Sequence, residues 1–130
     1  AELRVENKLE NLVYARSRLV HAGASKGVDV IDVPYLNLEN MEGMKKEAQF
    51  VKNLGFTGKG SIHPKQISIL NEIFTPSEEE LEWADKVLSS NQGGDSTAAA
   101  SRKVDGRVIL PQHIEIAGRL RKLADEIAAG

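Results

Sequence analysis

The stretch VDVIDV at residues 28–33 decides the fold of this chain. Four of its six residues are β-branched, which favours a strand, and Pro34 ends that strand because proline brings no N–H to a sheet ladder. Upstream, the three-and-four spacing of one face predicts an amphipathic helix over residues 7–26 that ends at Gly27. That face is marked by Leu9, Leu12, Val13, Arg16, Leu19 and Val20.

Downstream of Pro34 the sequence predicts a helix, a strand and another helix. The first of these helices is stopped by Gly55, and the strand, residues 59–63, is closed by Pro64. Pro64 then begins a helix whose apolar face is Ile67, Ile69, Leu70 and Ile73. The face of the earlier helix is Met41, Met44, Ala48, Val51 and Leu54.

The last third of the chain predicts two more helices around an extended piece. Ser77 and Glu80 have the spacing of a capping box, so a helix begins there. Residues 91–101 are rich in Gly, Ser and Ala and predict a mobile loop or linker. Residues 103–110 predict an extended segment turning at Asp105-Gly106, and residues 111–128 a final helix.

Alternation of strands and helices implies parallel strands joined by right-handed crossovers. Parallel sheets are normally buried on both faces, and VDVIDV is apolar enough to require that burial. Two strands cannot supply it. The residues therefore predict an α/β chain that is part of a larger sheet.

Composition excludes several classes of protein. A chain of 130 residues can bury one core, and 41% hydrophobic with 28% charged residues is ordinary for a globular protein. A net charge of −2 gives no basic footprint for nucleic acid, and no apolar run approaches the roughly 20 residues of a membrane span. Without cysteine there is no disulfide or thiolate site. The lack of cysteine also fits a reducing compartment, and the expected location is the cytoplasm, or the mitochondrial matrix in a eukaryote.

Two segments carry a resemblance to a known family. YARSRLVHAGASKGVDVIDVPY (residues 14–35) and, more closely, GFTGKGSIHPKQISILNEIFTPSEEELEWADKVL (residues 55–88) resemble the citrate lyase β-subunit family. That family includes malyl-CoA and citramalyl-CoA lyases, within the metal-dependent aldolase-type lyases. The resemblance extends from about Leu9 onward and corresponds to the C-terminal part of the family.

The resemblance implies a fold and a division of the chain. It implies the C-terminal portion of a TIM (β/α)8 barrel, about two βα units, followed by a helical lid extension. Residues 1–90 would then be barrel, residues 91–102 a flexible linker, and residues 103–130 the lid segment and its helix.

The resemblance also implies a reaction. Family members cleave a short 3-hydroxy-acyl-CoA of the citryl-, malyl- or citramalyl-CoA type to acetyl-CoA and an oxo acid, through an enolate, with Mg²⁺. The family's metal ligands, a Glu and an Asp on earlier strands, match no residue here, so no metal ligand is expected in this chain. The implied partners are the acyl-CoA substrate and further copies in a trimer or hexamer.

Four residues near the predicted strand ends are candidates for substrate or CoA binding: Asp32, Lys59, His63 and Gln66. Asp32 either lies at the mouth of the site or bonds the loop backbone around Pro34 and Tyr35. His63 either bonds a thioester oxygen or locks the strand-to-helix turn ahead of Pro64. Lys59 either meets a CoA phosphate or is an exposed, solvated lysine.

Leu110 is the departure from the family pattern. Many members present an aspartate in a hairpin-like G-x-M-I-D segment, where this chain has GRVIL at residues 106–110. Leucine cannot transfer a proton, and Asp105 lies on the other side of the turn. Two hypotheses follow: a lyase of this family, or a non-catalytic paralogue or truncated subunit that serves as an assembly module. An unrelated two-layer α/β binding domain is a third, and would require the long GFTGK–IHP–FTPS succession to be coincidental.

Overall fold

A computed structural model describes Glu6, residues 8–91 and residues 103–130. The chain forms two compact units, Ala1–Phe74 and Thr75–Gly130. This boundary lies before the fourth helix, whereas the boundary expected from the resemblance lies after residue 90. The predicted linker of residues 91–102 lies outside the described residues, apart from Asn91, where that helix ends.

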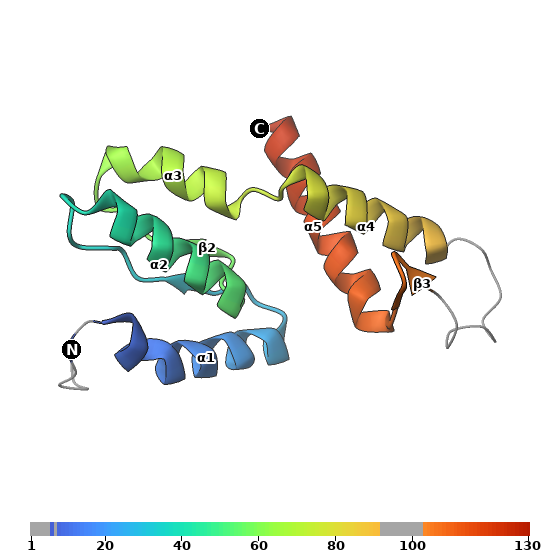
Figure 1. The fold of residues 1–130 in the computed structure, drawn as a ribbon, viewed down its shortest axis with the longest axis horizontal. Helices are drawn as coiled ribbons and strands as arrows, with labels where there is room; N and C mark the ends of the chain where they lie inside the picture. The colour runs from blue at the N-terminus through green and yellow to red at the C-terminus, as the bar shows by residue number, and fades with distance from the viewer. Residues whose placement is uncertain (1–5, 7, 92–102) are drawn as a thin grey trace. The chain divides into compact units, whose positions relative to one another are not determined.

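The first unit contains two parallel strands and three helices (Figure 1). Helix α2 connects strand β1 to strand β2, and helix α3 follows β2, so the predicted pair of βα units is present. The elements are α1 (Leu9–Lys26), β1 (Ile31–Asp32), α2 (Met41–Leu54), β2 (Gly58–Lys59) and α3 (Pro64–Phe74).

Both strands are shorter than the sequence predicts. The expected strand of residues 28–33 is reduced to Ile31–Asp32, and the expected strand of residues 59–63 is wrong except at Lys59, because β2 is Gly58–Lys59 and residues 60–63 form a loop. Ile31 pairs with Gly58 and Asp32 with Lys59. Backbone bonds from Thr57 N to Val30 O and from Gly60 N to Asp32 O close the ladder at its two ends. A regular strand needs a partner along its whole length, and here the two segments diverge into loops beyond these bonds.

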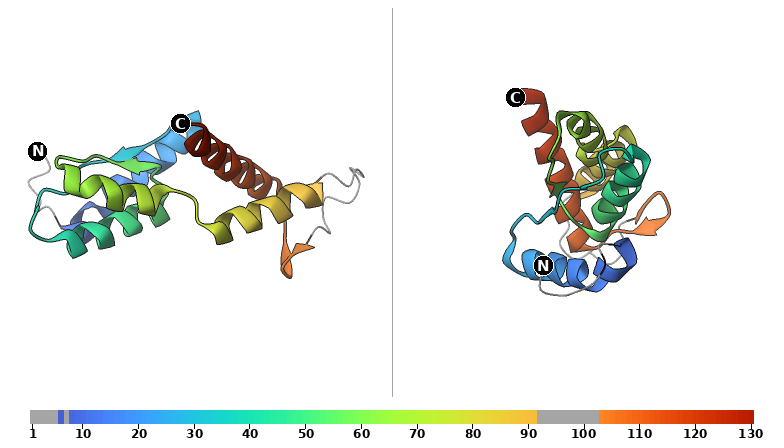
Figure 2. Two further views of the ribbon diagram at one scale, coloured as in Figure 1. Left: turned by 90° about the horizontal axis from the view of Figure 1, so that it is seen from above. Right: turned by 90° about the vertical axis from the view of Figure 1, so that its left-hand side faces the viewer.

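The helices lie along one side of the strand pair (Figure 2, left view). Between α2 and α3, the residues Met44, Ala48, Leu70 and Ile73 form a buried apolar cluster. The opposite side chain of β1, Ile31, is 67% exposed. The sheet therefore has a covered face toward the helices and an open apolar face.

The predicted helix ends are confirmed. α1 and α2 end at Gly27 and Gly55, both in the left-handed conformation. The predicted inner face of α1 is only partly correct, since Arg16 is buried as that face predicts but Leu19 is 57% exposed.

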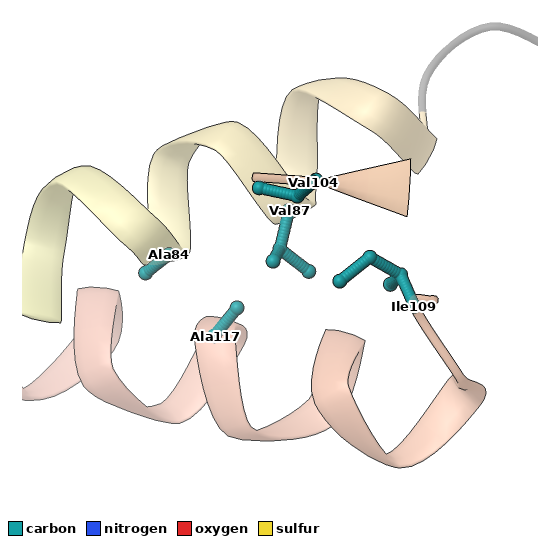
Figure 3. Close-up of a cluster of buried hydrophobic side chains, with 5 residues drawn as sticks. All are labelled: Ala84, Val87, Val104, Ile109 and Ala117. Atoms are coloured by element: carbon teal, nitrogen blue, oxygen red, sulfur yellow. The ribbon is translucent and has the colours of Figure 1, made fainter. Parts of the chain in front are cut away.

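The second unit packs helix α4 (Glu78–Asn91) against helix α5 (Pro111–Ala129) and a hairpin of β3 (Lys103–Val104) and β4 (Arg107–Val108). Its core consists of Ala84, Val87, Val104, Ile109 and Ala117, which converge between the two helices and the hairpin (Figure 3). None of the helices in the described part of the chain has the length and apolarity needed to cross a membrane.

The local signals of the second unit are confirmed as well. Ser77 N donates to Glu80 Oε2 at 2.8 Å and Glu80 N donates to Ser77 Oγ at 3.1 Å, which is the predicted capping box. Asp105 and Gly106 have φ of 49° and 79°, so the hairpin turns through two residues of positive φ, the pattern of a type I′ turn.

Candidate functional site

Four charged side chains meet beneath the strand pair. Asp32 ends β1 and Lys59 ends β2, so the parallel register places them side by side. Arg16 comes to them from α1 and Glu47 from α2. Arg16, Asp32 and Lys59 are at most 8% exposed, and the Glu47 side chain is 15% exposed. We call these four residues the buried charge cluster.

The guanidinium of Arg16 holds Asp32 with two parallel bonds. Nε donates to Oδ1 and Nη2 donates to Oδ2, both at 2.9 Å. Nη2 also reaches Glu47 Oε1 at 3.2 Å. A bidentate Arg–carboxylate pair is the strongest kind of ionic hydrogen bonding in proteins. Arg16 Nη1 is buried without a hydrogen-bond partner among the described residues, so the network is not fully satisfied.

Lys59 donates its ammonium protons to three acceptors. Nζ lies 2.6 Å from Asp32 Oδ2, 2.7 Å from Glu47 Oε1 and 2.7 Å from the backbone oxygen of Val33. Two cations and two carboxylates balance, so the cluster carries no net formal charge. Because buried charges are tolerated only when paired, this balance is what allows four of them beneath one sheet.

The structure corrects two of the sequence expectations. Lys59 is not an exposed, solvated lysine: its side chain is 0% exposed and its three protons are all donated within the chain. Asp32 does not bond the loop backbone around Pro34 and Tyr35, but pairs with Arg16 and Lys59. Both side chains point from the sheet toward the helices.

Glu47 is the member that sequence reasoning missed. It lies three residues after Met44 and four before Val51, on the buried face of α2. Arg16 interrupts the face of α1 in the same way. A charged residue within an apolar helical face is therefore the sequence signal that could have revealed Glu47. Arg16 and Glu47 are two such residues of opposite charge, which together indicate a buried ion pair.

His63 and Gln66 follow the carboxyl end of β2, at the end of a loop and in the first turn of α3. We call residues 33–40 the β1 loop and residues 60–63 the β2 loop. Gln66 is completely buried in the first turn of α3, and its Nε2 donates to Tyr35 O in the β1 loop at 2.9 Å. Its Oε1 accepts from Ile62 N at 2.9 Å and from Ser61 Oγ at 3.1 Å in the β2 loop.

His63 caps helix α3. Its Nδ1 accepts from Lys65 N at 3.1 Å, and Pro64 is the first residue of the helix. This agrees with the expectation that His63 locks the turn ahead of Pro64. Since Nδ1 is an acceptor here, the neutral ring carries its proton on Nε2. Nε2 has no hydrogen-bond partner in the described part of the chain, and His63 is half-buried.

Leu110 lies in the second unit, between the hairpin and α5. It is the N-cap residue of α5, its side chain is 42% exposed, and its backbone N donates to His113 Nδ1 at 3.0 Å. Asp105, in the hairpin turn, is exposed and pairs with Lys86 of α4 at 3.1 Å. Neither residue belongs to the buried charge cluster.

The residues present do not fit a divalent metal. No group of three or more His, Asp or Glu side chains that could hold a metal ion occurs among the residues that the structure describes. Asp32 and Glu47 converge, but Arg16 and Lys59 already neutralise their charge. A cation there would face two fixed positive groups.

A family model described as a C–C bond lyase of the TIM-barrel fold matches residues 11–122. The chain is 30% identical over 116 residues to the citrate lyase subunit beta of Leuconostoc mesenteroides subsp. cremoris, covering 89% of this chain and 38% of that protein. It is 32% identical over 81 residues to the mitochondrial citramalyl-CoA lyase of Mus musculus, covering 62% of this chain and 24% of that protein. The chain thus spans well under half the length of these relatives.

Solved structures are similar to this chain as well, among them RipC and CitE. RipC from Yersinia pestis superposes with a TM-score of 0.60 at 36% identity, over 62% of this chain and 37% of that one. The protein CitE from Mycobacterium tuberculosis, solved with magnesium, acetoacetate and coenzyme A, superposes with a TM-score of 0.71 over 96% of this chain and 45% of that one. At 22% identity the second likeness concerns the fold alone.

Proposed function

Since this chain belongs to the C–C bond lyase family of the TIM-barrel fold, we propose that the protein carrying it cleaves a short 3-hydroxy-acyl-CoA thioester to acetyl-CoA and an oxo acid. The family match over residues 11–122 is the observation that carries the proposal. Relatives named citrate lyase subunit beta, citramalyl-CoA lyase and (3S)-malyl-CoA thioesterase support a CoA thioester as the substrate class. Because the chain spans a minor part of these relatives, the reaction is proposed for the whole protein.

The proposed cleavage is a retro-aldol step. A base takes the proton of the 3-hydroxyl, its oxygen becomes the carbonyl of the oxo acid, and the C2–C3 bond breaks. The electron pair of that bond stays on C2 as the enolate of acetyl-CoA, which then takes a proton at C2. The largest electrostatic demand is therefore the negative charge that develops on the thioester oxygen.

His63 is the residue of this chain that we assign to that oxygen. Ligands of α/β sheets bind beyond the carboxyl ends of the strands, and His63 is the last residue of the β2 loop, four residues after β2 ends. Its Nε2–H is a donor not used inside the described part of the chain, and the Lys65 N–H holds the ring by Nδ1. Asp32, Lys59 and Gln66 have their polar atoms engaged by protein groups, so we assign them to support of the site rather than to contact with the thioester.

Mg²⁺ is proposed as the cofactor of the whole protein. When bound, a hard divalent cation would neutralise the substrate carboxylate and polarise its oxygens. The described residues offer no such site, so its ligands are assigned to residues outside those described.

The test uses the complete protein with Mg²⁺ and measures acetyl-CoA release from citryl-, malyl- and citramalyl-CoA. We expect release from one of them, and a drop of kcat by about 10²–10³-fold in His63→Asn, the range found when one oxyanion donor is removed. Asparagine keeps a capping oxygen for α3 but is too short to replace Nε2. His21→Asn, on the exposed face of α1, is the matched control and should retain full activity.

A non-catalytic assembly module is the second candidate, favoured by Leu110 in place of the family's aspartate. Absence of acetyl-CoA release from all three thioesters, in a folded protein with Mg²⁺, would favour this candidate over the lyase.

A further inference from the structure

Gln66 joins two loops that the sequence places far apart. Its two amide ends face opposite partners: Nε2 donates to Tyr35 O in the β1 loop, and Oε1 accepts from Ile62 N in the β2 loop. Tyr35 O can only accept and Ile62 N can only donate, so the partners themselves fix which way the amide points. A carboxylate or an apolar side chain cannot satisfy both loops.

Contacts beside Gln66 bring the same two loops together independently. A Cβ added to Gly60 would lie 2.9 Å from Pro34 Cγ, so a residue without a side chain is needed for the loops to approach this closely. Lys59 Nζ also holds Val33 O at 2.7 Å. The loops are therefore in direct contact, and the buried amide fixes their separation.

His63 receives its orientation from this arrangement. Gln66 N donates to His63 O at 2.9 Å, and Ser61 Oγ lies 3.0 Å from His63 O and 3.1 Å from Gln66 Oε1, which share its single proton. The backbone of His63 is thus bonded to the residue that ties the two loops. A shift of Gln66 therefore moves the His63 ring, while the ring itself is chemically unchanged.

We propose that Gln66 is a positioning residue that locks the β1 and β2 loops together and thereby sets the position of His63. The proposal rests on the proposed function for its effect on catalysis, but the lock itself is a property of the free protein. Gln66 does not touch the thioester, because the residue is completely buried and both polar atoms of its amide bond protein groups.

The test variant is Gln66→Met in the complete protein, which keeps the length of the side chain and removes its amide. Gln49→Met, at an exposed position of α2, is the matched control. We expect kcat/KM to fall at least tenfold in Gln66→Met and to be unchanged in Gln49→Met. In a His63→Asn background the same Gln66→Met substitution should change kcat/KM less than twofold, because the residue it acts through is already gone. An equal fold-loss in both backgrounds would overturn the proposal.

A second measurement does not depend on activity. Hydrogen exchange of the Ile62 amide, which is donated to Gln66 Oε1, should be at least tenfold faster in Gln66→Met. Unchanged exchange would refute the lock. If the unmodified protein releases no acetyl-CoA, the proposed function fails, while the exchange result still decides the lock.

Ser61→Ala is the variant for the case in which Gln66→Met does not fold. Ser61 is exposed, so removal of its hydroxyl should leave folding intact, yet that hydroxyl lies within hydrogen-bond distance of both Gln66 Oε1 and His63 O. We expect a roughly threefold fall in kcat/KM that disappears in the His63→Asn background. No fall, or a fall that persists there, counts against the proposal.

Discussion

Arg16 Nε lies 2.9 Å from Asp32 Oδ1, joining the middle of helix α1 to the last residue of strand β1. Lys59 of β2 also pairs with Asp32, and it pairs with Glu47 of α2 as well. Two helices and two strands are therefore fastened at one buried point. The energetic consequence is asymmetric: removing the whole cluster could be tolerated, but removing one member leaves an uncompensated buried charge.

Arg16→Met should destabilise the complete protein by about 3–5 kcal/mol, because Asp32 and Glu47 are left with one cation between them. Arg18→Met removes a guanidinium from an exposed position of the same helix and should cost less than about 0.5 kcal/mol. Chemical unfolding of the two variants measures the difference. Equal stabilities would show that the buried charge cluster contributes nothing specific.

Lys59 should resist chemical labelling. Its ammonium is buried and donates to three acceptors, whereas Lys65, six residues later, is exposed. Brief treatment of the native protein with an amine-acylating reagent, followed by peptide mass spectrometry, should modify Lys65 and leave Lys59 unmodified. Comparable labelling of both would mean that the Lys59 ammonium is accessible and could bind a CoA phosphate.

Two glycines that have open space where a Cβ would stand should respond in opposite directions to alanine. Gly106 has φ of 79° in the hairpin turn, so Gly106→Ala should destabilise by about 1 kcal/mol through backbone strain. Gly118 lies within α5, where alanine is the better helix former, so Gly118→Ala should stabilise by about 0.5–1 kcal/mol. Thermal unfolding gives the sign of each change: stabilisation by Gly106→Ala would contradict the type I′ turn, and destabilisation by Gly118→Ala would contradict the helix-propensity argument.

The capping box of α4 should be measurable in the same way. Ser77→Ala removes the oxygen that accepts from Glu80 N and should cost about 1 kcal/mol. Ser89→Ala, on the exposed face of the same helix, replaces a serine by a stronger helix former and should be neutral or slightly stabilising. If Ser77→Ala is also neutral, α4 is held by its packing on α5 and not by its cap.

Helix boundaries were predictable because their causes are local. Gly27 and Gly55 end helices in a left-handed conformation, Pro64 begins one, and Ser77 with Glu80 caps another, all within a few residues of the feature they control. The hairpin turn at Asp105-Gly106 has the same origin. Such signals do not depend on what the rest of the chain does.

The sequence by itself determined the parallel βα units, the helix ends and the placement of Asp32 at the end of a strand. His63, which the sequence predicts to end the second strand, lies instead in the loop four residues after β2 ends. Only the tertiary structure decided which groups these residues meet. Arg16, Glu47 and Lys59 are 16, 15 and 27 residues from Asp32 in the chain, and no local pattern selects among the possible partners at such separations. The physical reason is that a buried charge needs a partner in space. Asp32 and Lys59 are therefore a closed ion pair beneath the sheet, and of the four candidates only His63 keeps an uncommitted polar atom among the described residues.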